Sequence, residues 1–344
     1  MLMKRKLKTL LPVGWLLRLT ALAVLAGIAT GCTDSDSGEV PLTEEAIPVQ
    51  LFARGGALEG SAAVTVTRTE PEEAFKASVA FASESGQYAS LTGEKEGIWT
   101  ADVDKSGGMT WNTEGGKAAP VYPPYGDYLY LVAWAPMAVP ADGSVTYTLT
   151  GQEDLLYVSE LRGCKWDGER FYGNTLSQKD KPLTFNHLLT RIRFKACKKK
   201  NGGLPVKILK VTVNEAKTQA VVPLATGEPA FSTPSGSANG LSLTPEDGSN
   251  EVAGTTSVEL GNLMLPPLDG SAGAEYTLTV ETSTGTYNNV KITYGDAQPS
   301  GILKAGMSHV VTLTLSDYTL SITSITVEPW ELVDAGDLGI GDRD

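Results

Sequence analysis

Apolar and polar residues alternate in short runs along most of this chain, and clusters of Gly, Pro, Asn, Asp and Ser separate the runs. A period of two places alternate side chains on the two faces of a β-strand. No long stretch keeps a helical period, so the pattern predicts an all-β sandwich or barrel. Strands are expected within residues 62–68, 127–136, 144–151, 191–197, 206–215, 275–282, 288–295 and 309–330.

Three segments need a separate interpretation. Residues 69–84 open with Thr69, Pro71 and acidic residues, which also suit the first turn of a helix, so a helix is an alternative there that the pattern does not favour. Residues 226–254 are rich in Gly, Ser, Pro and Thr and are expected to form a long exposed loop. Residues 127–136 are apolar on both faces, which is typical of a central, buried strand.

The N-terminus has the layout of an export signal. Basic residues between positions 4 and 8 precede an apolar run that ends just before Cys32. Its uninterrupted part, residues 19–28, is shorter than the roughly 20 residues that a membrane-spanning helix needs. We therefore expect a cleaved signal peptide over residues 1–31, followed by a polar tether over residues 32–48.

The remaining length suffices for two domains of ordinary size. Charge and proline in "SQKDKPLTF", residues 177–185, separate two β-rich halves. We therefore expect one β-sandwich domain over residues 49–181 and a second over residues 182–344.

Composition disfavours several classes of function. The net charge of −12 argues against binding nucleic acid, because phosphates need a basic surface. The two histidines, His187 and His309, leave little material for a metal centre or a catalytic triad and are expected to be structural. No carboxylate pair, phosphate loop or nucleophile motif is recognisable. We therefore expect no enzyme, no cofactor and no metal site.

Three cysteines remain to be interpreted. Residues 29–31 followed by Cys32 resemble the lipobox of bacterial lipoproteins, which implies that the Cys32 thiol carries lipid such as palmitate; a plain signal peptide with an incidental cysteine is the alternative. The acidic stretch after Cys32 resembles the surface-export signal of Bacteroidota lipoproteins, so an outer-membrane location at the cell surface is expected. Cys164 and Cys197 either form a disulfide or stay free, and the sequence leaves both open.

Four blocks carry a more specific resemblance. In order they are "VYPPYGDYLYLVAWAP" (121–136), "EDLLYVS" (153–159), "PLTFNHLLTRIRFKA" (182–196) and a final "VEPW" (327–330). Together with the lipobox they resemble the fimbrillin family of Bacteroidales, the subunits of type V pili. The resemblance implies two transthyretin-like β-sandwich domains and a non-enzymatic subunit of a surface fimbrium with a role in cell adhesion.

The same resemblance implies an assembly mechanism. In the family, a trypsin-like protease cuts after an arginine in the first strand, and a strand from a neighbouring subunit then fills the opened groove, which is strand exchange. Two arginines of this chain are candidates, Arg54 and Arg68. Arg54 is favoured, because it follows the alternating "VQLFA" and is flanked by glycines. Partners would be other fimbrial subunits, the outer membrane, and a host glycan or protein.

The donated strand would be the C-terminal tail. Its apolar candidates are Leu332, Leu338 and Ile340, but Asp334, Asp337 and several glycines weaken its strand character. A stalk subunit and an accessory or tip subunit therefore stay open.

A second class of function is a surface lipoprotein that binds glycans through exposed tryptophans such as Trp99, Trp111 or Trp166, although a scattered Trp more often packs in a core.

The block "LTFNHLLTRIRF" also predicts local structure. Leu188 lies at a bend, after which Ile192 and Phe194 face inward and Arg191 and Arg193 face outward. His187 is expected to make a structural hydrogen bond.

Overall fold

A computed structural model describes residues 46–55, 74–91, 97–171, 182–237, 239–268, 275–292, 303–316, 319–328 and 330. Within these ranges the chain consists of β-strands, turns and three short 3-10 helices, η1 (Glu114–Gly116), η2 (Pro124–Gly126) and η3 (Asp167–Glu169). The all-β prediction is confirmed. The segment for which a helix was an alternative contains the strand β2 (Phe75–Ala82).

The N-terminal strands form a seven-stranded sheet. Its order is β1 (Ala53–Gly55), β8 (Leu183–His187), β7 (Leu156–Gly163), β5 (Leu129–Ala135), β2, β3 (Ile98–Val103) and β4 (Met109–Trp111). All neighbours are antiparallel except β1 and β8, which are parallel. β5, predicted as a central strand, is the fourth of the seven, and its last five residues are buried.

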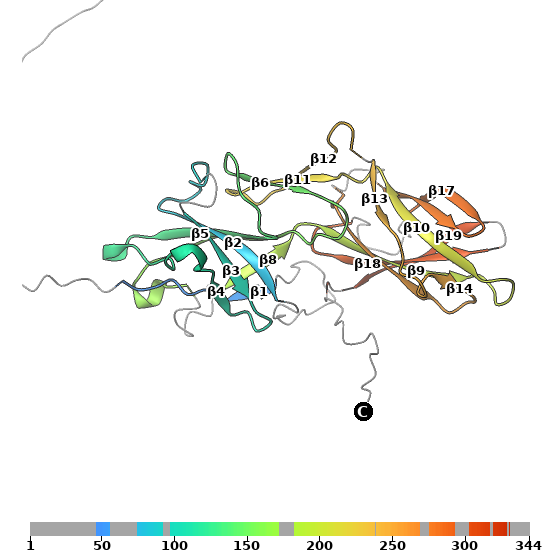
Figure 1. Cartoon of the computed structure of the whole chain (residues 1–344), viewed down its shortest axis with the longest axis horizontal. Coiled ribbons are helices and arrows are strands. Elements are labelled where there is room, and N and C mark those ends of the chain that lie inside the picture. Colours follow the sequence, from blue (N-terminus) through green and yellow to red (C-terminus); the bar gives the residue numbers. More distant parts are fainter. Residues whose placement is uncertain are drawn as a thin grey trace, which may run out of the picture. The chain divides into compact units, whose positions relative to one another are not determined.

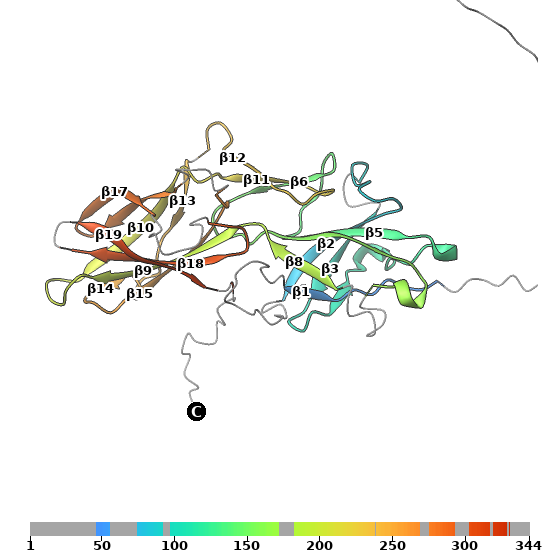
Figure 2. The same cartoon turned by 180° about the vertical axis from the view of Figure 1, so that it is seen from behind.

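A three-stranded sheet covers one face of this seven-stranded sheet. Its order is β12 (Ala230–Ser232), β11 (Gln219–Pro223) and β6 (Ser144–Thr148). Val145 and Val222 pack in one buried cluster with Ala80, Val132 and Trp134 of the larger sheet. In both Figure 1 and Figure 2, β6 and β11 lie across from β2 and β5.

The later strands form two further sheets. One has the order β13 (Gly240–Leu243), β10 (Val206–Asn214), β16 (Thr277–Thr282) and β17 (Gly285–Lys291), and β14 (Glu251–Val252) also pairs with β10. The other has the order β15 (Val258–Leu265), β9 (Thr190–Lys198), β18 (Ser308–Leu315) and β19 (Leu320–Glu328). Side chains of both sheets, including Phe194, Val211 and Leu278, share one buried cluster, so they form a sandwich.

Two local predictions were wrong. Residues 226–254 are not one loop, because β12, β13 and β14 lie within them. Arg191 does not face outward: it is 4% exposed, its Nε donates to the Ser308 hydroxyl (3.0 Å), and its guanidinium lies 5.0 Å from the centre of the Trp330 ring. Ile192 and Phe194 are fully buried, as predicted.

The open question about a disulfide is answered for the described chain, where Cys164 and Cys197 are both free thiols. Cys164 is buried just after β7 in the seven-stranded sheet. Cys197 lies on β9 in another sheet, with its Sγ 3.5 Å from the Thr314 hydroxyl.

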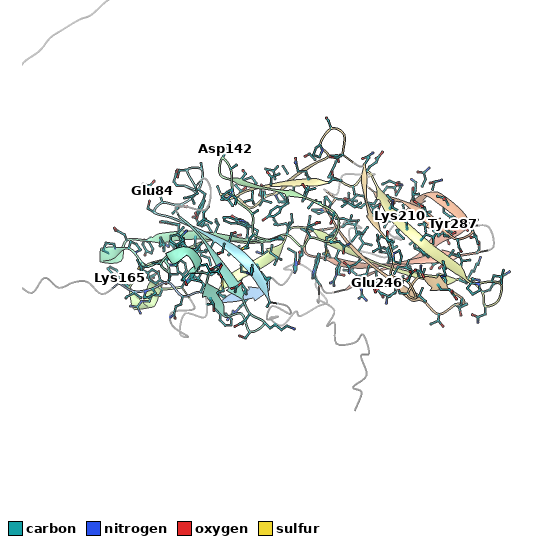
Figure 3. All side chains as sticks on the ribbon, in the orientation of Figure 1. Glu84, Asp142, Lys165, Lys210, Glu246 and Tyr287 are labelled. Atoms are coloured by element: carbon teal, nitrogen blue, oxygen red, sulfur yellow. The ribbon has the colours of Figure 1, made fainter. Side chains whose placement is uncertain are left out.

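The division into two domains at residue 181 stays a prediction. β8 belongs to the seven-stranded sheet, and β9, which begins three residues after β8 ends, belongs to the four-stranded sheet with β15, β18 and β19. The chain therefore passes from one sheet to the other at Leu188 and Leu189, near the expected boundary. Acidic side chains such as Glu84, Asp142 and Glu246 project to solvent from turns and loops (Figure 3).

His309 on β18 predicts an acid sensitivity. It is 1% exposed, and burial lowers its pKa to about 4. The unfolded chain binds this proton near pH 6.5, so the neutral ring contributes stability that is present above pH 6.5 and lost as the pH falls toward 4. Between pH 7 and pH 4, the parent protein should lose up to about 3 kcal/mol more unfolding free energy than the His309→Gln variant, because glutamine has no proton to bind.

Urea unfolding of both proteins at each pH measures this difference. Glu153 and Glu160 also have lowered pKa values and destabilise both proteins in acid, so only the difference between the two curves reports on His309. Parallel curves over this pH range would contradict the prediction.

Candidate functional site: the leading segment of the seven-stranded sheet

Residues 47–55, here called the leading segment, belong to the first described range and end in β1. Their side chains alternate as the sequence indicated: Val49 is 0% exposed, Leu51 3% and Ala53 0%, with Ile47 packed against the same core. Gln50 between them is exposed. The leading segment therefore lays one apolar face on the core of the seven-stranded sheet.

The core beneath the leading segment is a separate cluster. It contains Leu183 and Phe185 from β8, Val103 from β3, and Tyr122 and Phe171 from the connecting loops, all nearly fully buried. The Phe171 N–H donates to the Tyr122 hydroxyl (2.8 Å), and their rings stack with centroids 5.8 Å apart. Burial raises the pKa of Tyr122, which keeps its hydroxyl neutral in this apolar setting.

The leading segment is hydrogen-bonded on two sides. Toward β8, Ala53 and Gly55 pair in register with Leu183 and Phe185, and the Leu183 N–H donates to the Phe52 carbonyl (2.8 Å). Toward the turn between β3 and β4, the Ala53 N–H donates to the Gly107 carbonyl (2.8 Å). β1 therefore stands at one end of the strand order but also reaches the turn between β3 and β4, near the other end.

The second row of bonds continues upstream. The Val49 N–H donates to the Pro120 carbonyl (2.8 Å), the Tyr122 N–H donates to the Ile47 carbonyl (3.0 Å), and the Trp111 indole N–H donates to the Val49 carbonyl (2.7 Å). Removal of the leading segment would leave these groups and those of β8 without partners and would uncover a strip of core.

One glycine is needed for this close approach. Gly107 has φ +91°, and a Cβ atom there would lie 2.4 Å from the Ala53 carbonyl oxygen. Any larger residue would push the leading segment away from the β3–β4 turn.

Arg54, the favoured processing site, lies inside β1. It pairs with Thr184 and is half-buried, so the Arg54–Gly55 bond belongs to the β1–β8 ladder. The flanking glycines predicted easy access for a protease, but the pairing with β8 restricts access to this bond. A cut at this bond requires the three-pair ladder to open first. Arg68, the second candidate, lies outside the described residues, as do Cys32 and the tail positions Leu332, Leu338 and Ile340.

The last described residue, Trp330, marks where that tail begins. Its ring stacks on His187 at the end of β8, with centroids 4.2 Å apart and planes 23° apart, and the Arg191 guanidinium lies on it as well. His187 Nδ1 is 2.9 Å from an Asp154 carboxylate oxygen, which confirms its expected hydrogen bond. The tail therefore starts beside the strand with which β1 pairs.

The tryptophans proposed for glycan binding differ in their surroundings. Trp99 donates its indole N–H to the Ala118 carbonyl (3.0 Å) and has the Lys117 ammonium 4.3 Å from its ring centre. Trp111 holds the leading segment, as described above. Trp166 is 63% exposed, and its ring lies close to the backbone of Gly126.

The described residues show two negative findings. They contain no group of three or more His, Cys, Asp or Glu side chains that could hold a metal ion. None of the short helical turns in these ranges has the length or apolar character needed to span a bilayer.

Comparison with known proteins places the chain in a family. A model of fimbrillin-like proteins matches residues 63–330, most of the chain, so this protein belongs to the fimbrillin-like family. No curated protein sequence matches it.

Solved structures share its fold at low sequence identity. A candidate cell adhesion protein from Bacteroides ovatus superposes with a TM-score of 0.54 and 16% identity, covering 84% of this chain and 100% of that one. A candidate cell adhesion protein from Bacteroides uniformis gives a TM-score of 0.52 and 15% identity, covering 83% of this chain and 98% of that one.

The position of the leading segment predicts its effect on stability. Leu51→Ala should lower the free energy of unfolding by about 2–5 kcal/mol, because it leaves a cavity above the core at a site where the backbone is held on both sides. Leu204→Ala, at a position 87% exposed, is the matched control and should change it by less than about 0.5 kcal/mol. Equal effects in urea unfolding would show that the leading segment is not part of the core.

Proposed function

We propose that this chain is a non-enzymatic structural subunit of a surface pilus, exported as a lipoprotein on Cys32, with a role in adhesion. We further propose that it accepts a strand from another subunit after a protease removes its leading segment at Arg54. Membership of the fimbrillin-like family supports the pilus role. The observation that carries the acceptor role is the double row of hydrogen bonds along residues 47–54, above a continuous strip of core.

The physical basis is that the contacts of the leading segment are easily reproduced by another sequence. Most of them use backbone groups on its two sides and three small or aliphatic side chains spaced two residues apart. Any extended segment with that alternation meets the same demands. Each buried Val, Leu or Ile contributes about 1.5–3 kcal/mol and each hydrogen bond about 1 kcal/mol net, so the joint would be long-lived.

The tail is a weaker donor than the leading segment. In an extended chain, Leu332, Leu338 and Ile340 fall on one face, but Asp334 falls on that face too. A carboxylate on the buried face is costly. Acceptance is therefore better supported for this chain than donation, and its place as stalk, accessory or tip subunit depends on the tail.

Cleavage predicts a first test. Limited digestion of the full chain with trypsin should yield a new N-terminus at Gly55, and Arg54→Gln should abolish that product. Arg68→Gln should leave it unchanged, and Arg162→Gln, at an exposed position on β7, is the matched control. N-terminal sequencing and intact mass identify the product. Cleavage that yields Thr69 as the new N-terminus, or none, would overturn the assignment to Arg54.

Strand exchange predicts a second test. After cleavage, the chain should form oligomers that resist unheated detergent, while the uncut Arg54→Gln chain should stay monomeric. A cut chain that remains monomeric, alone and with whole-cell fimbrial extract, would contradict the acceptor role.

A mixing experiment separates donor from acceptor. A cut chain shortened after Trp330 has no donor, and an uncut chain has no opened groove. If the tail donates, the tail of the uncut chain should fill the groove of the cut chain, and assembly should stop at dimers with one copy of each. Mass spectrometry measures the composition of these dimers. If only monomers form while the cut chain binds another fimbrial subunit, the tail is not the donor and the chain is an acceptor alone.

A further inference from the structure

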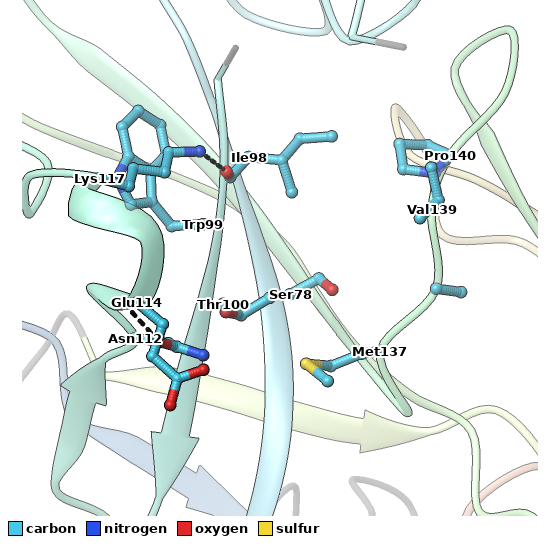
Figure 4. Close-up of a pocket in the computed structure, with 11 residues that line it drawn as sticks. Ser78, Ile98, Trp99, Thr100, Asn112, Glu114, Lys117, Met137, Val139 and Pro140 are labelled. Atoms are coloured by element: carbon cyan, nitrogen blue, oxygen red, sulfur yellow. Dashed lines mark hydrogen bonds between the residues drawn. The ribbon is translucent and has the colours of Figure 1, made fainter. Parts of the chain in front are cut away.

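A pocket of 470 Å³ opens on the face of the seven-stranded sheet opposite the leading segment. It lies between strands β2 and β3, the stretch after β4, and the loop that joins β5 to β6 (Figure 4). Its size is that of an ordinary small-molecule site. Among the described residues, none of the leading segment lines it, so a role for this pocket does not depend on removal of that segment.

One wall of the pocket is a row of polar side chains. Ser78 on β2 pairs directly with Thr100 on β3, and the Asn112 N–H donates to the Thr100 carbonyl (2.9 Å), so the three side chains lie side by side on one face. Ser78 is 3% exposed and forms the floor. The strand backbone fixes their spacing, which gives the row a rigid geometry.

The orientation of Asn112 is fixed by η1. Its Oδ1 accepts the Glu114 backbone N–H (2.9 Å), so its NH₂ group remains to donate into the pocket. The Glu114 side chain is exposed beside it, and Figure 4 shows its carboxylate next to the Asn112 side chain. Among the described residues this carboxylate has no ion-pair partner.

Lys117 also lines the pocket, and its ammonium is held by contacts within the chain. Its ammonium donates to the Ile98 carbonyl and lies 4.3 Å from the centre of the Trp99 ring. It thereby covers one face of that ring. Figure 4 shows Lys117 at the Ile98 and Trp99 end of the pocket and Glu114 beside Asn112, so the charge next to the polar row is that of Glu114.

The opposite wall is apolar and held in place from behind. Met137 and Val139 are 45% and 58% exposed, and buried Pro140 follows them. The Tyr147 hydroxyl donates to the Pro136 carbonyl (2.8 Å), and the Trp134 indole N–H donates to the Ala138 carbonyl (3.0 Å). Because these anchors hold alternate residues of the loop, the side chains of Met137 and Val139 are left on the side of the pocket, as Figure 4 shows.

From this geometry we infer that the pocket binds a pyranose ring that carries no acid group, as the terminal sugar of a glycan. Such a ring has a C–H face that packs on aliphatic side chains and a rim of hydroxyls that match Ser78, Thr100 and Asn112. The Glu114 carboxylate accepts from a hydroxyl or an ammonium and repels a sugar carboxylate. Neutral hexoses, N-acetylhexosamines and amino sugars therefore fit, and uronic or sialic acids do not.

Saturation-transfer NMR and calorimetry on the full chain test this inference. The protein is held in a detergent without a sugar headgroup, and the probes are methyl glycosides of glucose, galactose, mannose, N-acetylglucosamine, glucosamine and glucuronic acid. At least one non-acidic glycoside should bind. Asn112→Ala and Val139→Ala should each weaken it by about tenfold, the loss expected for one hydrogen bond or one apolar contact.

Matched variants control for general effects. Thr110→Ala lies on the same sheet face outside the pocket, Val121→Ala is an exposed valine elsewhere, and both should bind normally. Glu114→Gln should weaken the glucosamine derivative more than the neutral sugars and reduce the exclusion of glucuronide. Thermal unfolding checks that each variant is folded.

Three results would overturn the inference: no binding of any glycoside up to 20 times the concentration of protein sites, binding that the pocket variants do not change, or preference for the glucuronide.

Discussion

The two rows of hydrogen bonds along residues 47–54 hold the seven-stranded sheet closed. One row joins β8, and the other joins the β3–β4 turn and the loop around Pro120. The leading segment thus connects parts of the sheet that lie far apart in its strand order, and the cluster around Phe185 and Phe171 stays dry beneath it. Because most of these bonds use backbone groups, the position demands an extended, alternating strand and very little else.

Strand positions were largely predictable, because alternation is a local property. β5, β6, β9, β10, β16, β18 and β19 all lie within or close to runs that alternate in the sequence. The short strands between residues 226 and 254 were missed because Gly, Ser and Pro dominate there, and their pairing with β10 and β11 supplies what local propensity lacks.

The candidate site was predictable on one side only. "VQLFA" shows the buried positions Val49, Leu51 and Ala53, but nothing local shows that Gly107 and Pro120 approach them. Arg191 was misassigned for the same reason, since an outward arginine in a strand is the usual case and its partner Ser308 is 117 residues away. Likewise, the surroundings of Trp99 and Trp111 depend on Lys117 and on the leading segment, which only the fold brings near.

The Arg54–Gly55 bond lies within a ladder of only three residue pairs, at the end of a segment otherwise anchored at Ile47, Val49 and Ala53. Proteases need several residues of extended, unpaired backbone, so any cut there waits for the end of the strand to fray. A substitution that strengthens the β1–β8 pairing would then delay the cut without any change in the protease. The rate at which the end of the sheet opens would then set an upper limit on the rate of any cleavage at this bond.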